Sequence, residues 1–412
     1  MRANRTFYLL IALVILILGA FAIYRAAWDS QQRTDYTVYV AAGQALLDHR
    51  DIYLAQSIRG WRYVYPPPFA ILLVPLARIP LTLGASIWYL LSVASIGASA
   101  IMSAALLGPT PLKAKPYLIY GLPLLSLFTL LISGTLRCQA SPFMFFFMIA
   151  AFYFHLKNHP IAAGFSLACA VLLKVFPIVL IIYFILRRDW RAVIATFGIL
   201  ILFGIILPSL YWGWQFNFHQ FAGWFDVVGH PAMMQNTDRA HVTSLYEQLL
   251  NTTKPRNQSL ESLFLSFGMP ARFTRYAVVA SGGLMLAIMG ISARRIQSSE
   301  MDKEQPSMAQ NLLCSAFIIW SLLISPIAET HYFGALILPL TLLVGCVEQS
   351  RQTRRSKNYC LIIGCAIMAL VMITLPIDAI ALWRPLCIAS ILMWLLCICL
   401  IWHFKHAKPG FL

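Results

Sequence analysis

Long uninterrupted apolar stretches run through this chain, and they constrain its fold more than any other feature. Residues 7–23 and 192–210 each approach the roughly 20 residues that an α-helix needs to cross a bilayer. Charged residues make up only 11% of the 412 residues, too few to cover a soluble surface. A membrane β-barrel would alternate polar and apolar residues, and these stretches do not. The sequence therefore predicts an all-α polytopic membrane protein, with residues 1–412 forming a single integral membrane domain.

About twelve transmembrane helices are expected, with both termini in the cytoplasm. The distribution of charge supports this topology, because cytoplasmic loops gather Lys and Arg. The inner segments would carry 17 of the 31 basic residues but only five of the 15 acidic residues. We therefore attribute the net charge of +16 to membrane topology and expect no nucleic-acid partner. The expected helices are 7–24, 81–107, 117–133, 142–157, 160–174, 176–187, 191–211, 273–292, 311–325, 332–347, 360–376 and 386–403.

The segment 160–187 leaves two topologies open. Lys174 and Pro177 interrupt its apolar sequence, so that each half alone is short. A single long crossing would place the basic residues of 351–357 outside, whereas two short passes or a re-entrant pair keep them inside. Broken helices are tolerated at membrane depth where they line a polar cavity.

Two long external segments are expected, at about 25–80 and 212–272. In the first, residues 65–76 are apolar and bounded by prolines, but they are too few to span a bilayer. They favour a helix lying in the membrane interface, preceded by amphipathic structure over 35–48. The second segment begins with many aromatic residues, which prefer the headgroup level.

Asp35 is the first candidate for chemistry. It follows the first expected helix by about ten residues, which puts a carboxylate near the external membrane surface. There it could act as a general base for a hydroxyl nucleophile, a role that typically contributes about 10²–10⁴ in rate. The alternative is a helix N-cap, since Thr34 and Asp35 precede a helical pattern.

Lys174 is the second candidate, because it lies among apolar residues. A charge at the centre of a membrane helix costs roughly 2.5–3.5 kcal/mol on insertion scales, so intramembrane charges commonly mark functional sites. Lys174 could be the counter-charge for a lipid phosphate, or it could extend its ammonium to the interface from a helix end.

Other polar residues cluster at predicted external helix ends. His331 and Glu329 follow Ser325-Pro326, and His331 could bind phosphate or a sugar hydroxyl. Arg137 and Gln139 lie in a short external connection. Cys and His residues show no spacing typical of metal ligands, so no metal site, disulfide framework or cofactor is expected.

The candidate residues belong to a longer pattern of motifs. It begins with Asp35-Tyr36-x-Val38-Tyr39-x-Ala41-Ala42-Gly43-x-Ala45-Leu46-Leu47, Tyr53, Tyr65-Pro66-Pro67, Pro75-Leu76 and Trp88, and it continues through Leu173-Lys174-Val175-Phe176-Pro177. The later motifs are Asn257-Gln258-Ser259-Leu260 and the stretch from Ser325 to Tyr332. This order of motifs resembles glycosyltransferase family 87. Two departures occur: Cys138-Gln139-Ala140-Ser141 stands where the family usually has Gly-Gln-x-Asn, and Thr330 precedes His331 where an acid is common.

The resemblance implies a C-type glycosyltransferase fold and a polyprenyl-phosphate sugar donor, with mannose foremost. It also implies inverting transfer to a glycan or glycolipid acceptor at the external face of the inner (plasma) membrane. Asp35 would be the general base. The donor phosphate and substrates would contact Lys174, His331, Arg137, Gln139, Tyr65, Asn257 and Glu329.

Three alternatives stay open at this point. A membrane transporter would also have many helices, but it would need more binding charges at the bilayer midplane than Lys174 alone. A polymerase or ligase that uses a lipid diphosphate would favour more clustered external arginines. In a scaffolding subunit, Asp35 and Lys174 would be dispensable. The chain lacks the Asp-x-Asp pattern of enzymes that use soluble nucleotide sugars, which favours a lipid donor.

Overall fold

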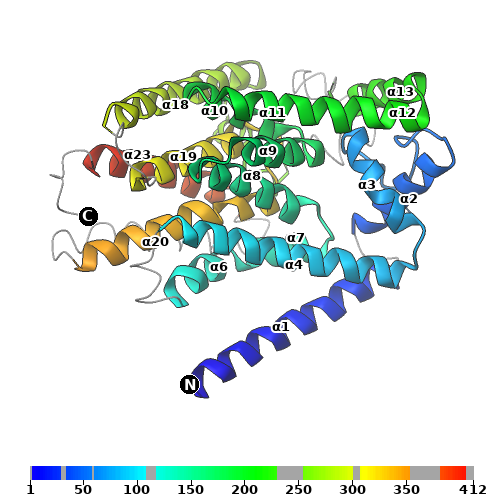
Figure 1. Ribbon diagram of the computed structural model, residues 1–412, viewed down its shortest axis with the longest axis horizontal. Coiled ribbons are helices and arrows are strands. Elements are labelled where there is room, and N and C mark those ends of the chain that lie inside the picture. Colours follow the sequence, from blue (N-terminus) through cyan, green and yellow to red (C-terminus); the bar gives the residue numbers. More distant parts are fainter. Residues whose placement is uncertain are drawn as a thin grey trace.

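The computed structural model describes residues 2–28, 34–57, 60–107, 117–229, 254–299, 307–352 and 381–404. Within these ranges all regular elements are helices, and β-structure is limited to two isolated bridges. The helices form a bundle, with α2 (Tyr36–Leu47) and α3 (Pro67–Ala77) gathered at one end (Figure 1). Helix α1 (Arg2–Ala27) leans away from the bundle toward its N-terminus (Figure 1).

Five helical segments are long and apolar enough to cross a membrane. A sixth is obtained if Leu118–Ser126 and Phe128–Leu136, which meet at 64°, count as one bent span. The prediction of a multi-pass helical membrane protein is thus confirmed, whereas the count of twelve spans stays a prediction, and residues 360–376 lie outside the described residues. The five segments are Leu81–Ala105, Trp190–Trp212, Ala271–Ile296, Thr330–Glu348 and Pro385–His403.

The remaining predicted helix positions within the described ranges hold shorter apolar helices. The N-terminal helix contributes an apolar segment over Leu13–Ala27. The others are α8 (Ser141–Leu156), α9 (Pro160–Leu173), the pair η2 (Phe176–Leu180) and α10 (Ile181–Leu186), and α19 (Met308–Ile324).

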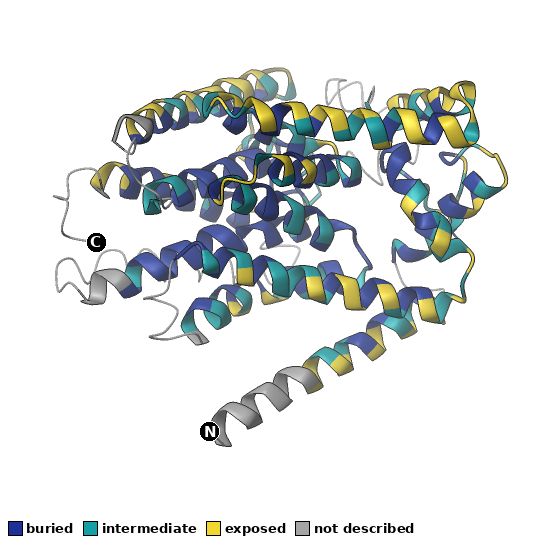
Figure 2. Cartoon of the chain, viewed as in Figure 1, coloured by how far each residue is buried: buried dark blue, intermediate teal, exposed yellow. Residues whose placement is uncertain are grey.

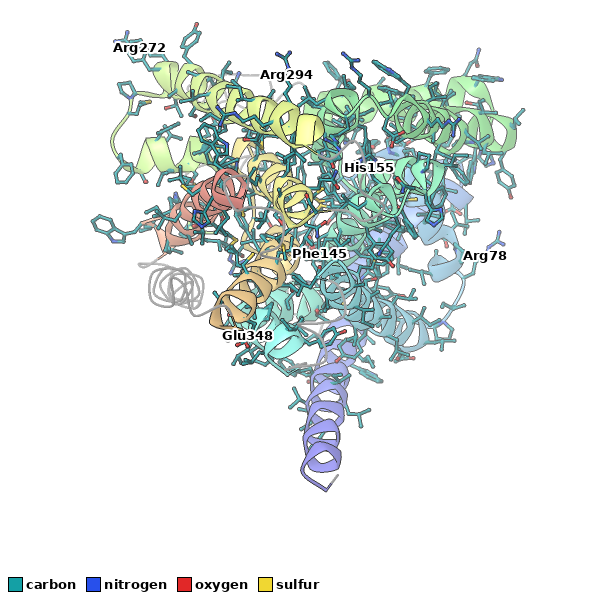
Figure 3. The ribbon with its side chains drawn as sticks, turned by 60° about the vertical axis from the view of Figure 1, so that its left-hand side comes forward. Arg78, Phe145, His155, Arg272, Arg294 and Glu348 are labelled. Carbon is teal, nitrogen blue, oxygen red and sulfur yellow. The ribbon has the colours of Figure 1, made fainter. Side chains whose placement is uncertain are left out.

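The core of the bundle is formed by α8, α19, η5 (Thr330–Leu336) and α20 (Ile337–Gln352). Phe145 of α8 lies near the middle of the molecule (Figure 3) and packs against Gly334 of η5, where any larger side chain would collide with its ring. Around this core, α11 (Trp190–Ile201) and α18 (Ala271–Ser299) carry exposed outer faces (Figure 2). Their exposed Ile, Phe and Leu side chains are suited to contact with lipid.

Residues 160–187 form two helical arms, α9 and the pair η2 and α10. The first arm begins and the second arm ends at the same end of the bundle. Gln139, just before α8, contacts Tyr65 at one end, whereas His155 in the last turn of α8 bonds Asp189 at the other, with Nδ1 to Oδ2 at 2.7 Å. Since α9 begins shortly after His155 and α10 ends shortly before Asp189, both arms join at that far end. The reversal between them lies at Lys174, which supports the pair of short segments over one long helix.

Helices α2 and α3 pack directly on each other in the first predicted external segment. Gly43 makes this possible, because a Cβ there would lie 2.8 Å from the Leu73 carbonyl oxygen. The prolines at the start of α3 fit its first turn, where an amide hydrogen has no helical partner. This close pairing brings the start of α2 beside Tyr65, the residue that precedes α3 by two positions.

Candidate active site

Asp35 lies immediately before α2, but its carboxylate does not cap that helix. Its side chain accepts no hydrogen bond from the first turn, and the Thr34 hydroxyl accepts the Tyr36 amide hydrogen instead, at 3.3 Å. The Asp35 amide donates to the Arg137 carbonyl at 3.0 Å, which ties α2 to the end of α7 (Phe128–Leu136). Helix capping therefore does not explain the position of the Asp35 carboxylate. Its Oδ2 instead accepts a hydrogen bond from the Tyr65 hydroxyl at 2.8 Å.

A short chain of hydroxyl groups leads to this carboxylate. The Tyr39 hydroxyl donates to the Tyr65 hydroxyl at 2.9 Å, and both rings are buried with an edge-to-face packing. Gln139 Oε1 lies 3.3 Å from the same Tyr65 oxygen. Since the Tyr65 oxygen accepts the hydrogen bond from Tyr39, the hydroxyl hydrogen of Tyr65 is donated to Asp35, the nearer of its two acceptors.

The environment makes Asp35 an unusually basic carboxylate. Burial raises its pKa to about 6, while the Tyr65 hydrogen bond and the charge of Lys174 oppose this shift. Glu329 adds to the shift and Arg137 opposes it. Asp35 is still partly exposed. A carboxyl with this pKa is mostly ionised at pH 7 yet basic enough to accept a proton from a reacting hydroxyl.

Lys174 lies at the reversal between the two arms of 160–187. Its backbone is extended, which ends α9 and turns the chain before Pro177. The ammonium lies 3.8 Å from the centre of the Tyr332 ring and 5.3 Å from that of Tyr65. In the part of the chain that the structure describes, no carboxylate lies within ion-pair distance of it. The cation is therefore held by aromatic faces and is not neutralised by a direct partner.

Glu329 and His331 complete the same neighbourhood. His331 is buried, and its Nε2 lies 3.4 Å from Glu329 Oε2 without a hydrogen-bond partner among the described residues. Lys174, Arg137 and Arg256 all act on this imidazole electrostatically. Glu329 in turn acts on both Asp35 and Lys174.

Asn257 holds the loop that carries these two residues. Its Nδ2 donates to the Pro326 carbonyl at 2.9 Å, and its Oδ1 accepts the amide hydrogens of Ala328 at 3.1 Å and Ser259 at 3.2 Å. The side chain is buried. Its amide is thus engaged in the loop, so Asn257 holds the loop in place, and its contact with substrate stays a prediction.

Sequence reasoning named Asp35, Tyr65, Arg137, Gln139, Lys174, Glu329 and His331, and the structure brings these residues together. It did not name four of their neighbours as site residues: Tyr39, Tyr332, Arg25 and Arg256. The two arginines carried a signal, since both are basic residues on the side predicted to be external. Within the described ranges, no group of three His, Cys, Asp or Glu side chains gathers to hold a metal.

Comparison with known proteins gives this group of residues a context. The family model described as glycosyltransferase family 87 matches residues 63–326. Two curated relatives carry the name polyprenol-phosphate-mannose-dependent alpha-(1-2)-phosphatidylinositol mannoside mannosyltransferase. The relative from Mycolicibacterium smegmatis is 24% identical over 388 residues, which cover 85% of this chain and 77% of the relative. The relative from Mycobacterium tuberculosis is 25% identical over 370 residues, with 82% and 76% covered.

No solved structure matches the chain. The family match nevertheless spans well over half of the sequence, including Tyr65, Arg137, Gln139, Lys174 and Asn257. It ends before Glu329 and His331, and it begins after Asp35. On the extent of this match, the chain is an enzyme that belongs to glycosyltransferase family 87.

Proposed function

We propose that this enzyme transfers a hexose, with mannose foremost, from a polyprenyl-phosphate donor to a hydroxyl of a glycan or glycolipid acceptor. The names of the two relatives support this donor, because both are polyprenol-phosphate-mannose-dependent mannosyltransferases. The observation that carries the proposal is the pairing of a basic carboxylate with an ammonium that forms no ion pair among the described residues. Asp35 and Lys174 meet at Tyr65, one at its hydroxyl and the other at its ring.

The proposed reaction is a single displacement at the anomeric carbon. Asp35 accepts the proton of the acceptor hydroxyl while that oxygen forms a bond to C1 of the sugar. The bond between C1 and the phosphate oxygen breaks, and the polyprenyl phosphate leaves with the electron pair. Attack opposite the leaving group inverts the anomeric configuration.

Charge develops on the departing phosphate, and Lys174 is the proposed group that stabilises it. A fixed cation is most effective where charge grows in the transition state. The Lys174 ammonium is available for this role, since it contacts the Tyr332 ring. Among the residues that the structure describes, it forms no ion pair with a carboxylate. Tyr65 and Gln139 would orient Asp35, and His331 and Glu329 would hydrogen-bond the sugar or phosphate.

We also propose that the reaction takes place at the external (periplasmic) face of the inner (plasma) membrane, with both termini cytoplasmic. The positive-inside distribution supports this orientation. The clustering of the site residues at one end of α8 supports a single reactive face, because His155 and Asp189 mark the opposite end. Membership of a glycosyltransferase family favours transfer over the alternative of a membrane transporter.

The test uses the purified full chain in phosphatidylcholine liposomes. We expect it to transfer mannose from polyprenyl phosphate mannose to a phosphatidylinositol mannoside, with the new linkage opposite in configuration to the donor. GDP-mannose alone should give no product. Direct use of GDP-mannose would contradict the lipid donor, and retention of configuration would contradict the single displacement.

A further inference from the structure

A short turn at the end of the bundle remote from Asp35 carries three arginines. It joins α10 to α11, and its middle residue, Arg188, has a left-handed backbone with a φ of 56°. The Arg188 amide donates to the Ile185 carbonyl at 3.0 Å, and the Asp189 amide donates to the Phe184 carbonyl at 2.9 Å, which closes the end of α10. The three residues are Arg187, Arg188 and Arg191, and we call them the turn arginines.

The single acid in this turn does not neutralise the turn arginines. Asp189 Oδ2 lies 2.7 Å from His155 Nδ1, and Asp189 Oδ1 accepts the Ala192 amide hydrogen at 3.2 Å, which caps α11. Both carboxylate oxygens are thus engaged. Across the described ranges, none of the turn arginines forms an ion pair. An excess of positive charge therefore remains at this end of the bundle, where it attracts anions.

Arg187 lacks an acceptor within the part of the chain that the structure describes. Its Nη1 is buried and has no hydrogen-bond partner there. A buried guanidinium N–H without an acceptor is unfavourable, so an acceptor from another molecule would stabilise it. The neighbouring Arg188 is exposed and occupies a backbone conformation that glycine adopts more readily. A side chain kept at a cost to the backbone is common at functional positions.

Apolar side chains adjoin the turn arginines. Trp190 is exposed, and tryptophan prefers the headgroup level of a bilayer. Ile185 of α10 and Ile194 of α11 are exposed as well, and they are suited to contact with acyl chains. A cationic turn beside exposed apolar side chains fits a phospholipid better than a free phosphate ion. Membrane topology explains why basic residues lie at this end, but it does not explain the buried Arg187 Nη1.

We propose that the turn arginines bind the phosphate of an anionic phospholipid in the leaflet opposite the proposed reaction face. Arg187 is the inner contact, and Arg188 and Arg191 are the outer ones. Guanidinium groups suit this task, since their planar forks bind phosphate oxygens in a bidentate manner. A zwitterionic lipid brings its own cation to the site, so the excess positive charge favours the anionic class. None of these arginines takes part in the proposed sugar transfer, so this lipid site goes beyond that function.

The experiment measures lipid binding to the purified full chain in detergent. Native mass spectrometry gives the Kd for phosphatidylglycerol and for phosphatidylcholine with the same acyl chains. We expect the wild type to bind phosphatidylglycerol at least about tenfold more tightly, the scale of a lost charge-assisted hydrogen bond. Arg187→Gln should remove most of this preference. Arg187→Lys should keep part of it, since it retains the charge but not the planar fork.

Two further variants separate loss of the site from loss of the fold and from general attraction of anionic lipid. Glycine suits the left-handed backbone at position 188, so Arg188→Gly should unfold at the wild-type temperature or above while its preference for phosphatidylglycerol falls. Arg78→Gln is the matched control, because Arg78 is exposed and follows α3 at the other end of the bundle (Figure 1). This control should keep the wild-type preference.

Equal affinity of the wild type for the two lipids would overturn the proposed site. So would a preference that persists in both Arg187→Gln and Arg188→Gly, or one that Arg78→Gln removes to the same extent. Inorganic phosphate in large excess, at matched ionic strength, should not displace phosphatidylglycerol, and displacement would mean that the turn takes a free phosphate ion. Sugar transfer is not part of the readout, so failure of the proposed function would leave these outcomes unchanged.

Discussion

Asp35 and Lys174 share one neighbour, Tyr65, whose hydroxyl donates to Asp35 Oδ2 at 2.8 Å and whose ring centre lies 5.3 Å from the Lys174 ammonium. The two charged groups come from the first predicted external segment and from the reversal between two apolar arms. They are thus assembled by tertiary packing around one buried aromatic side chain. A proton acceptor and a cation held this way can serve opposite sides of a single displacement.

The pH dependence of the reaction should report Asp35. Burial raises its pKa to about 6, so the carboxylate loses its ability to accept a proton as the pH falls through this value. We expect log kcat/KM to fall with a slope of about one below pH 6. The measurement is the initial rate of mannose transfer between pH 4.5 and 8. An acidic limb whose midpoint lies at the ordinary pKa of aspartate would contradict the burial of the reacting carboxylate.

Tyr65→Phe should shift this acidic limb to higher pH. The Tyr65 hydrogen bond lowers the pKa of Asp35, so its removal leaves the ionised carboxylate less stabilised and raises that pKa. Tyr63→Phe is the matched control, because the Tyr63 hydroxyl donates to the Pro66 carbonyl at 3.0 Å and not to Asp35. A pH profile that is unchanged in Tyr65→Phe would rule out the assigned hydrogen bond during turnover.

Lys174→Met should raise the KM for polyprenyl phosphate mannose about tenfold or more, since a charged contact with phosphate is lost. The KM for the acceptor should change much less. Lys157→Met offers a comparison, because Lys157 is an exposed lysine that follows α8 at the far end of the bundle. Kinetics with each substrate varied in turn provide the measurement, and an unchanged donor KM would remove Lys174 from the phosphate site.

Asn257→Ala should lower both stability and activity. The substitution leaves the Pro326 carbonyl and the Ala328 amide without their buried partner, and each lost bond of this kind costs about 1–3 kcal/mol. Thermal unfolding in detergent should therefore begin at a lower temperature, with kcat reduced as Glu329 and His331 shift. The exposed Gln44→Ala is the reference. Normal stability combined with a raised substrate KM would instead indicate that Asn257 contacts substrate.

Much of the architecture followed from apolar patterning and charge. The positions of α4 (Leu81–Ala105), α18 and α23 (Pro385–Phe404) were predictable because each is an apolar stretch of spanning length. The shorter arms on either side of Lys174 were harder to predict, since length alone does not distinguish two half-length helices from one helix that crosses the membrane. His155 and Asp189 flank the two arms in the sequence, and the contact between them is a tertiary feature with no local sequence signal.

The site was predictable in its membership but not in its geometry. Asp35 and Lys174 stood out because charges are rare and costly in such a chain. Tyr39 and Tyr332 did not, since buried tyrosines are common and only packing shows that they adjoin the carboxylate and the ammonium. Asn257 was predicted to bind substrate, a role still untested, and its amide proves to be occupied by backbone groups.

The central claim is that Asp35 accepts the proton of the acceptor hydroxyl, and Asp35→Asn tests it most directly. The asparagine keeps the shape of the side chain but cannot act as a base at neutral pH. Because the pKa of Asp35 is raised to about 6 in the folded protein, its protonated form is favoured by folding, and the stability that protonation contributes is lost as the pH rises through 6. The neutral variant should therefore unfold at pH 7.5 at the wild-type temperature or above.

The decisive measurement is the single-turnover rate of mannose transfer by Asp35→Asn, with donor binding measured on the same preparation. The account predicts a rate reduced by about 10²–10⁴, while polyprenyl phosphate mannose still binds within about twofold of the wild type. Transfer at close to the wild-type rate in this variant would contradict the assignment of Asp35 as the base.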